Sequence, residues 1–268
     1  MRRLRRVIWY WALSFFVASC GFPMQQEADE ILRLGLSALS GKDQFAFQGI
    51  HQSVTVGLPP DSEVRFEGVV NQHHKVYLRF VQNGNKRPVA NQSVSNGQWI
   101  SLNEKQPSPY REFNPLAHIS DLKQLKKEVE NAPNKEISGA QKVRVILDEG
   151  ALKKRMIGKL GLDVEAYFSQ KMAGAQGNRG LGERELSIIR RELEEKTKNW
   201  KEQLEEIKGT LRVQGEYLLW IDRTSKLPVR MDTITVFRYE SGGEEREEKF
   251  IHSYRFKDYD RVTVEIAE

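Results

Sequence analysis

The chain has 268 residues, a single cysteine and a formal net charge of +5. Four of its 42 basic residues lie within the first six positions, and without residues 1–19 the balance is 38 basic to 37 acidic residues. The remainder of the chain is therefore close to neutral, which argues against a nucleic-acid-binding role.

Residues 1–19 have the pattern of an export signal. The arginine-rich start precedes an apolar run from Val7 to Val17, and Ala18 and Ser19 supply the small residues of a cleavage site. The whole uncharged run, Val7 to Met24, has 18 residues and includes serine, glycine and proline. A membrane-spanning helix is therefore the weaker interpretation.

The tetrad Val17-Ala18-Ser19-Cys20 resembles the lipobox of bacterial lipoproteins. The resemblance implies lipidation of the Cys20 sulfur, cleavage before it, and attachment to the extracytoplasmic face of the cell membrane through a tether over residues 20–26. Each buried methylene contributes ~0.8 kcal/mol, so two acyl chains anchor a protein durably. Lipidation also explains a lone cysteine in an exported protein. The alternatives are an ordinary secretory signal with an incidental cysteine and an uncleaved anchor.

Residues 27–268 are predicted to form one domain, because about 250 residues suit a single substantial core. From Glu27 to Ser40 apolar residues recur at helical spacing, and Gly41 is a stop signal. Asn96-Gly97 predicts a tight hairpin turn. Alternating apolar and polar residues predict consecutive antiparallel strands in three segments: 43–56, 62–70 and 75–81.

A second helix is expected over residues 115–131. Asn114 and Pro115 have the character of an N-cap and first helical residue, and apolar residues follow at helical spacing. Alternation predicts a further strand over residues 141–148.

A helical insert is predicted over residues 149–208. Apolar residues recur about every four positions in its first half. Gly158 and Gly161 are expected to break this stretch into two helices, with Asp163 capping the second. The glycine-rich residues 174–183 are interpreted as a linker, because a phosphate-binding loop would need a preceding strand.

The second half of the insert is predicted to be one long helix over residues 185–208. Its apolar residues lie on one side, and charged residues occupy the remainder. The heptad pattern lapses at Lys196 and Thr197, so packing against its own sheet is favoured over a coiled-coil partner.

The C-terminal third returns to strands, with a "SGGE" turn at residues 241–244. Within it, "YLLWIDRTSKLPVRMDTI" at residues 217–234 and "SYRFKDYD" at residues 253–260 resemble elements of the LolA/LppX-type lipoprotein-carrier superfamily. The resemblance implies an α+β fold in which a curved antiparallel sheet, a half-barrel, wraps around helices and encloses an apolar cavity for acyl chains. The insert is a departure from that family and would fill or cover the cavity.

Strand parity suggests which side chains would line such a cavity, because alternate residues of a strand share one face. The candidates for ligand-lining positions are Phe66, Leu78, Phe80, Leu219, Met231, Phe237 and Phe256.

No catalytic set is evident, so an enzyme, a cofactor and a metal are not expected. The five histidines lack metal-ligand spacing, and no Gly-x-Ser-x-Gly motif occurs. The favoured function is a membrane-anchored extracytoplasmic lipoprotein that binds a hydrophobic ligand, a lipid or acyl chain. The alternative is a regulatory or interaction lipoprotein that binds another cell-envelope protein through the helix over residues 185–208.

Overall fold

A computed structural model describes residues 23–55, 63–72, 75–81, 100–102, 113–178 and 180–261. The export signal, Cys20, the histidine pair at 73–74 and the Asn96-Gly97 turn lie outside the described residues. Among the residues described, no helix combines the length and the apolar character needed to cross a bilayer.

The described strands form one antiparallel sheet in which two meanders meet. The first runs through β1 (Gln44–Thr55), β2 (Val64–Asn71), β3 (Lys75–Val81) and β4 (Ile100–Leu102). The second runs through β5 (Lys127–Ala132), β6 (Ala140–Leu147), β7 (Arg212–Asp222), β8 (Pro228–Ser241) and β9 (Glu244–Lys257). Pairing of β1 with β9 joins the meanders, which gives the order β4-β3-β2-β1-β9-β8-β7-β6-β5.

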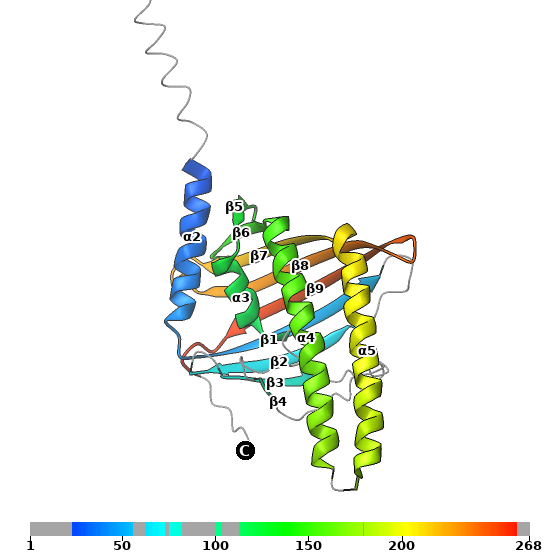
Figure 1. Cartoon of the computed structure of the whole chain (residues 1–268). Coiled ribbons are helices and arrows are strands. Elements are labelled where there is room, and N and C mark those ends of the chain that lie inside the picture. Colours follow the sequence, from blue (N-terminus) through cyan, green and yellow to red (C-terminus); the bar gives the residue numbers. More distant parts are fainter. Residues whose placement is uncertain are drawn as a thin grey trace, which may run out of the picture.

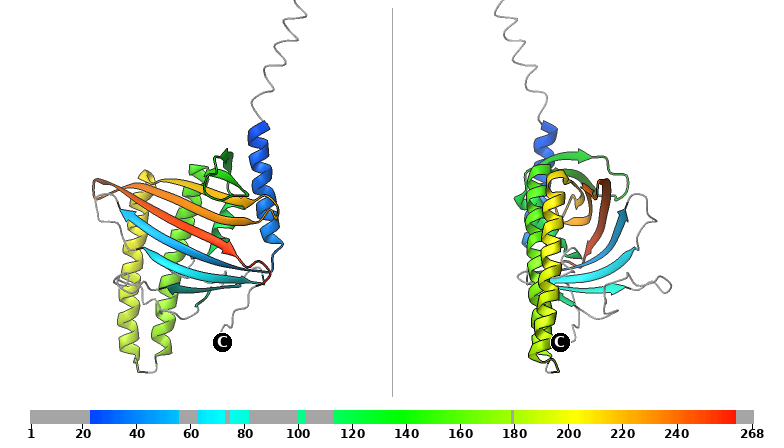
Figure 2. Two further views of the ribbon diagram at one scale, coloured as in Figure 1. Left: turned by 180° about the vertical axis from the view of Figure 1, so that it is seen from behind. Right: turned by 45° about the vertical axis from the view of Figure 1, so that its right-hand side comes forward.

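The described helices lie on one side of this curved sheet, as Figures 1 and 2 show. They are α2 (Pro23–Ser40), α3 (Pro115–Gln124), α4 (Glu149–Gly177) and α5 (Glu183–Thr210). The helices α4 and α5 form an antiparallel hairpin between β6 and β7, and its far end extends beyond the sheet. The predicted α+β fold with a curved sheet around helices and a helical insert before the C-terminal hairpins is confirmed.

The core fills the space between the concave face and the helices. From α2 it receives a stripe of apolar residues at helical spacing, which includes Ile31, Leu32 and Leu36. The close approach of α2 to the sheet depends on Gly35, where a Cβ atom would lie 2.7 Å from Ile221 Cδ1. On the sheet side, the rings of Phe47 and Phe66 are 1% and 2% exposed and contact each other edge to face.

Two local sequence signals, a helix N-cap and a glycine turn, fix the start of α3 and the turn between β8 and β9. The Asn114 side chain accepts a hydrogen bond from the Leu116 amide at 2.9 Å, so the predicted cap is confirmed. The predicted β8–β9 turn has Gly242 and Gly243 at φ values of 62° and 81°, a conformation that glycine adopts without steric cost.

The predicted helix over residues 115–131 is wrong in its second half. The helix α3 ends at Gln124, and Lys127–Ala132 is the edge strand β5. Val129 pairs with Val145 of β6, while its neighbours Glu128 and Glu130 are exposed. The strand satisfies the hydrogen-bonding groups along β6, which a helix at this place would leave unpaired.

The predicted break at Gly158 and Gly161 is also wrong, because α4 continues through both and Asp163 lies inside it. A glycine costs a helix only about 1 kcal/mol relative to alanine. Packing of α4 against α5 and β7 offsets that cost. The linker predicted over residues 174–183 is too long, because α4 continues to Gly177 and α5 begins at Glu183. The long second helix agrees with prediction, although it begins two residues earlier and ends two residues later. Similarly, α2 begins at Pro23, inside the expected tether.

Candidate functional site

A row of polar side chains crosses the concave face at its middle. The strand register places Tyr217 of β7, Thr233 of β8, His252 of β9 and His51 of β1 side by side. We call these four residues the polar row. All four are less than one tenth exposed, although the same face is otherwise apolar around them.

Hydrogen bonds connect three members of the polar row to one another and the fourth, Tyr217, to α3. Nδ1 of His51 lies 2.9 Å from Nε2 of His252, and Nδ1 of His252 lies 3.4 Å from the Thr233 hydroxyl. From α3, Nδ1 of His118 lies 3.3 Å from the Tyr217 hydroxyl. The His118 ring also packs at 5.2 Å from that of His252. Two hydrogen-bonded groups therefore meet beneath the helices, where the His118 and His252 rings pack.

Burial keeps the titratable members of the polar row uncharged at neutral pH. Desolvation lowers the pKa of His51 to about 4, and it lowers the pKa of His252 well below its usual range. Desolvation also raises the pKa of the Tyr217 hydroxyl, with the nearby Asp121 carboxylate as a second cause. At neutral pH the row therefore offers neutral hydrogen-bonding groups, because a desolvated charge is far more costly than a desolvated dipole.

The polar row separates two parts of the concave face. On one side the sheet is sealed core, where Leu219, Met231 and Tyr254 form the next row across β7, β8 and β9. On the other side Thr235 and Phe250 are paired on β8 and β9, and Phe237 follows along β8. A cavity of about 520 Å³ lies on this second side, covered by α3 and α4.

The cavity is mainly apolar, with a few polar groups. From the sheet, the Phe237 and Phe250 rings contact each other edge to face at 5.5 Å. From α4, Leu152, Met156 and Lys159 line it at helical spacing. This volume is within the range of about 300–1,000 Å³ typical of small-molecule sites, which combine an apolar lining with a few polar groups.

Local sequence explains why α4 begins where it does and packs closely enough on β7 to cover the cavity. Its N-cap is Asp148, whose carboxylate accepts a hydrogen bond from the Ala151 amide at 2.7 Å. Its first turn approaches β7 at Gly215, where a Cβ atom would lie 2.7 Å from Leu152 Cδ2. Arg155 then forms an ion pair with Asp121 of α3. The two helices are thereby joined across one wall of the cavity.

The rim of the cavity is apolar and open to solvent. Leu160 and Leu162 line it, yet 37% and 65% of their surface is exposed. Large exposed aliphatic residues beside an apolar cavity mark a route by which a hydrophobic molecule could enter.

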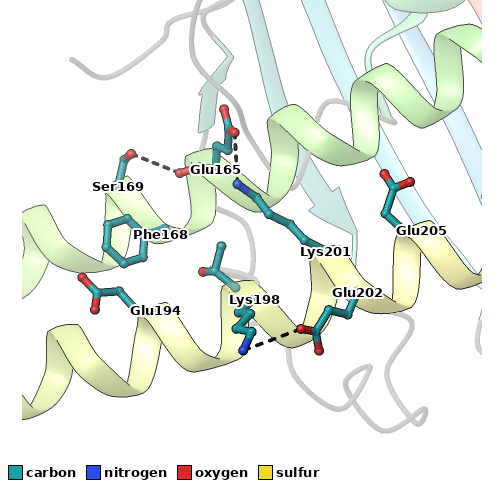
Figure 3. A pocket seen from close by; sticks show the side chains of 9 residues that line it. Glu165, Phe168, Ser169, Glu194, Lys198, Lys201, Glu202 and Glu205 are labelled. Atoms are coloured by element: carbon teal, nitrogen blue, oxygen red, sulfur yellow. Dashed lines mark hydrogen bonds and ion pairs between the residues drawn. The ribbon is translucent and has the colours of Figure 1, made fainter.

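A second and larger hollow of about 840 Å³ lies between α4 and α5 (Figure 3). Its walls carry mostly charged side chains, and Lys201 pairs with Glu165 at 3.3 Å while Lys198 pairs with Glu202 at 3.8 Å. These side chains are at least half exposed, so the pairs are solvated. This hollow is a wet groove between two surface helices, and the smaller cavity is the better candidate site.

Only one of the seven sequence-predicted lining residues, Phe237, lines the cavity. The other six lie on the core side of the polar row and are at most 6% exposed: Phe66, Leu78, Phe80, Leu219, Met231 and Phe256. Parity identified their face of the sheet but not their position along it.

The polar row was not predicted as part of a site. A signal was available, because His51 and His252 have the same strand parity as the buried Phe47 and Tyr254. Polar side chains on the inward face of a strand are an informative observation, because most buried positions are apolar. In the described parts of the chain, no group of three or more His, Cys, Asp or Glu residues is arranged to hold a metal.

The long helix α5 packs mainly on α4, and also on β8. The ring of Trp200 contacts that of Tyr167 in α4, with 4.9 Å between the ring centres. Thr210, at the end of the helix, accepts a hydrogen bond from the Glu240 amide of β8 at 3.0 Å. Trp200 and Ile188 remain 38% and 41% exposed. The expected packing on the sheet therefore applies only to part of the helix.

No family model matches the chain, and no curated protein matches it. Among solved structures, lipovitellin in a study of its lipid–protein interactions has a TM-score of 0.40 at 8% identity. That match covers 84% of this chain and 26% of lipovitellin, so the chain spans about a quarter of that protein.

Two bacterial structures also match over most of their length. A LolA superfamily protein from Nitrosomonas europaea has a TM-score of 0.25 at 10% identity and covers 88% of this chain and 94% of its own. A domain described as an outer membrane lipoprotein-sorting protein, from Vibrio parahaemolyticus, has a TM-score of 0.25 at 9% identity, with coverages of 86% and 93%. At these identities and TM-scores the similarities assign no function.

Proposed function

We propose that this protein is an extracytoplasmic lipoprotein, anchored through Cys20, which binds a hydrophobic ligand in the cavity between α4 and the concave face of the sheet. The observation that supports ligand binding is the cavity itself: about 520 Å³, lined by Met156, Phe237 and Phe250 and bordered by exposed leucines. Apolar surface of this kind gains free energy when a hydrocarbon chain replaces water.

A pair of neighbouring substitutions on β8 tests ligand binding. Thr235 lines the cavity, whereas Ile234 lies on the opposite face of the same strand. Thr235→Trp would fill the cavity, and Ile234→Trp adds the same bulk outside it. Native mass spectrometry of the full chain, extracted from membranes, would measure co-purifying lipid. We expect about tenfold less lipid on Thr235→Trp than on the native chain, and no change on Ile234→Trp. Equal occupancy in both variants would contradict the proposal.

The anchor is tested separately, since it depends on one atom. Cys20→Ser removes the sulfur that would carry the diacylglycerol, so we expect the variant to leave the membrane fraction. The mass of the native chain should show cleavage before Cys20 and the added lipid. Unchanged membrane attachment of the variant would contradict lipid anchoring.

Docking of a cell-envelope protein on the helix over residues 185–208 is a second proposal. It is supported by the exposed apolar surface of Ile188 on this helix. A photocrosslinking residue at position 188 should capture one defined envelope protein, and the same residue at the exposed position 195 serves as the control. Identical products at both positions would argue against a specific surface.

A further inference from the structure

The charge balance of the cavity is uneven. Asp121 is the only carboxylate among its lining residues, and it is already paired with Arg155. A second cation, Lys159, lines the same cavity from the next turn of α4 and forms no ion pair within the described residues. Since His252 and Tyr217 are neutral at physiological pH, the cavity carries a net charge of at least +1.

Lys159 lies close enough to the polar row to act on it. Lys159 and His252 line the same cavity, and the lysine charge is one of the lesser causes that lower the pKa of His252, for which desolvation is the largest. The lysine side chain is half-buried, whereas its neighbour Lys154 on the same helix is exposed. An anionic group of a ligand would form a charge-assisted pair with this partly buried cation, and such pairs are stronger than neutral hydrogen bonds.

The cavity is also divided into two chemical zones. Thr235, Phe250 and Phe237 continue away from the polar row along β8 and β9, and Met156 faces them from α4. His252 and Tyr217 of the row, with His118 and Lys159, form the polar zone. A molecule with one hydrocarbon chain and one anionic end matches both zones, while the volume of about 520 Å³ is too small for a lipid with several chains.

We propose that the ligand of this cavity is an anionic single-chain amphiphile, a fatty acid or a lysophospholipid, whose headgroup pairs with Lys159 beside the polar row while its chain lies on Phe237, Phe250 and Met156. This inference rests on the proposed function and narrows it to a ligand class. Lys159 is then a specificity-determining residue, because it distinguishes acids from neutral lipids of the same chain length.

Photolabelling of the full chain in membranes would test this ligand class. The probe is a long-chain fatty acid with a diazirine in mid-chain, and labelling should map to peptides of β8, β9 and α4. Two anionic competitors are added, oleic acid and lysophosphatidylglycerol, which represent the two sources of an anionic headgroup. Two neutral competitors, methyl oleate and oleyl alcohol, are added in parallel. Both anionic competitors should displace the probe about tenfold better than the neutral ones.

Matched lysine variants then assign the preference to one residue. Lys159→Met should abolish the difference between acid and ester, Lys159→Arg should preserve it, and the exposed control Lys154→Met should leave it unchanged. Equal displacement by acids and neutral lipids on the native chain would overturn this inference and leave hydrophobic binding intact. If no competitor reduces the photolabelling of these peptides, the proposed function would instead be overturned.

Discussion

The two faces of the sheet differ in the charge and the burial of their polar side chains. On the convex face Arg144 forms a two-bond pair with Glu216 at 2.8 and 3.0 Å, and Arg230 pairs with Asp232 at 2.6 Å. On the concave face the polar row is buried and neutral. The difference follows from solvent, because a partly exposed charge keeps some of its hydration, whereas a buried one would lose it.

The convex face also contains a buried aromatic ring. Trp220 is 1% exposed, and the cations of Lys142 and Arg230 each lie 4.4 Å from its ring centre. The stems of these long side chains cover the ring while their charges pair with Glu136 at the surface. Long charged side chains therefore cover this face, whereas whole helices cover the other.

The largest expected effect concerns the concave core. Phe47→Ala should lower the free energy of unfolding by about 3–5 kcal/mol, because it removes a ring packed against Phe66 and Tyr254. Its neighbour Gln48 is exposed on the convex face, so Gln48→Ala should change stability by less than about 0.5 kcal/mol. Denaturant unfolding of both variants measures the difference, and similar losses would contradict the assignment of faces.

The polar row should make stability depend on pH. The unfolded chain binds a proton on His51 below its ordinary pKa of 6.5, whereas the folded chain binds it only near pH 4. The free energy of unfolding should therefore fall as pH decreases from 6.5 to 4, by about 3 kcal/mol from this residue. The lowered pKa of His252 acts in the same direction.

The variant His51→Gln sharpens this test, because glutamine can keep a hydrogen bond to His252 but does not titrate. Unfolding curves between pH 6.5 and pH 5 should show a weaker pH dependence for the variant than for the native chain. Parallel pH dependences would mean that His51 does not remain neutral in the fold.

The smallest effect is expected on the convex face. Arg144→Met breaks the pair with Glu216 and a further contact with Glu130, yet the partners are 30% and 55% exposed. Stability should decrease by about 1 kcal/mol or less, and high salt should reduce the difference. Thermal unfolding at low and high salt measures this decrease in stability. A decrease as large as that caused by Phe47→Ala would show that the ion pairs of Arg144 are not solvated.

Local patterns predicted most of the elements because local geometry fixes them. Alternation identified β1, β2 and β3, and the Asn114 cap located the start of α3. The end of that helix could not be predicted in the same way. Val129 fits the spacing of a helix and of a strand equally well, and pairing with β6 decides between them.

The sequence by itself determined most of the antiparallel strands, the helical insert and the inward face of those strands, because a period of two follows from the backbone alone. The curvature of the sheet was implied by the family resemblance and not by a local pattern. Only the tertiary structure decided which inward residues are core and which line a cavity. That division depends on where α2, α3 and α4 cover the sheet and on a row contributed by β7, β8, β9 and β1. Whether a residue lies in the core or at the cavity depends on pairing and packing between residues as distant in sequence as His51 and His252. The spacing of residues within one segment does not contain that information.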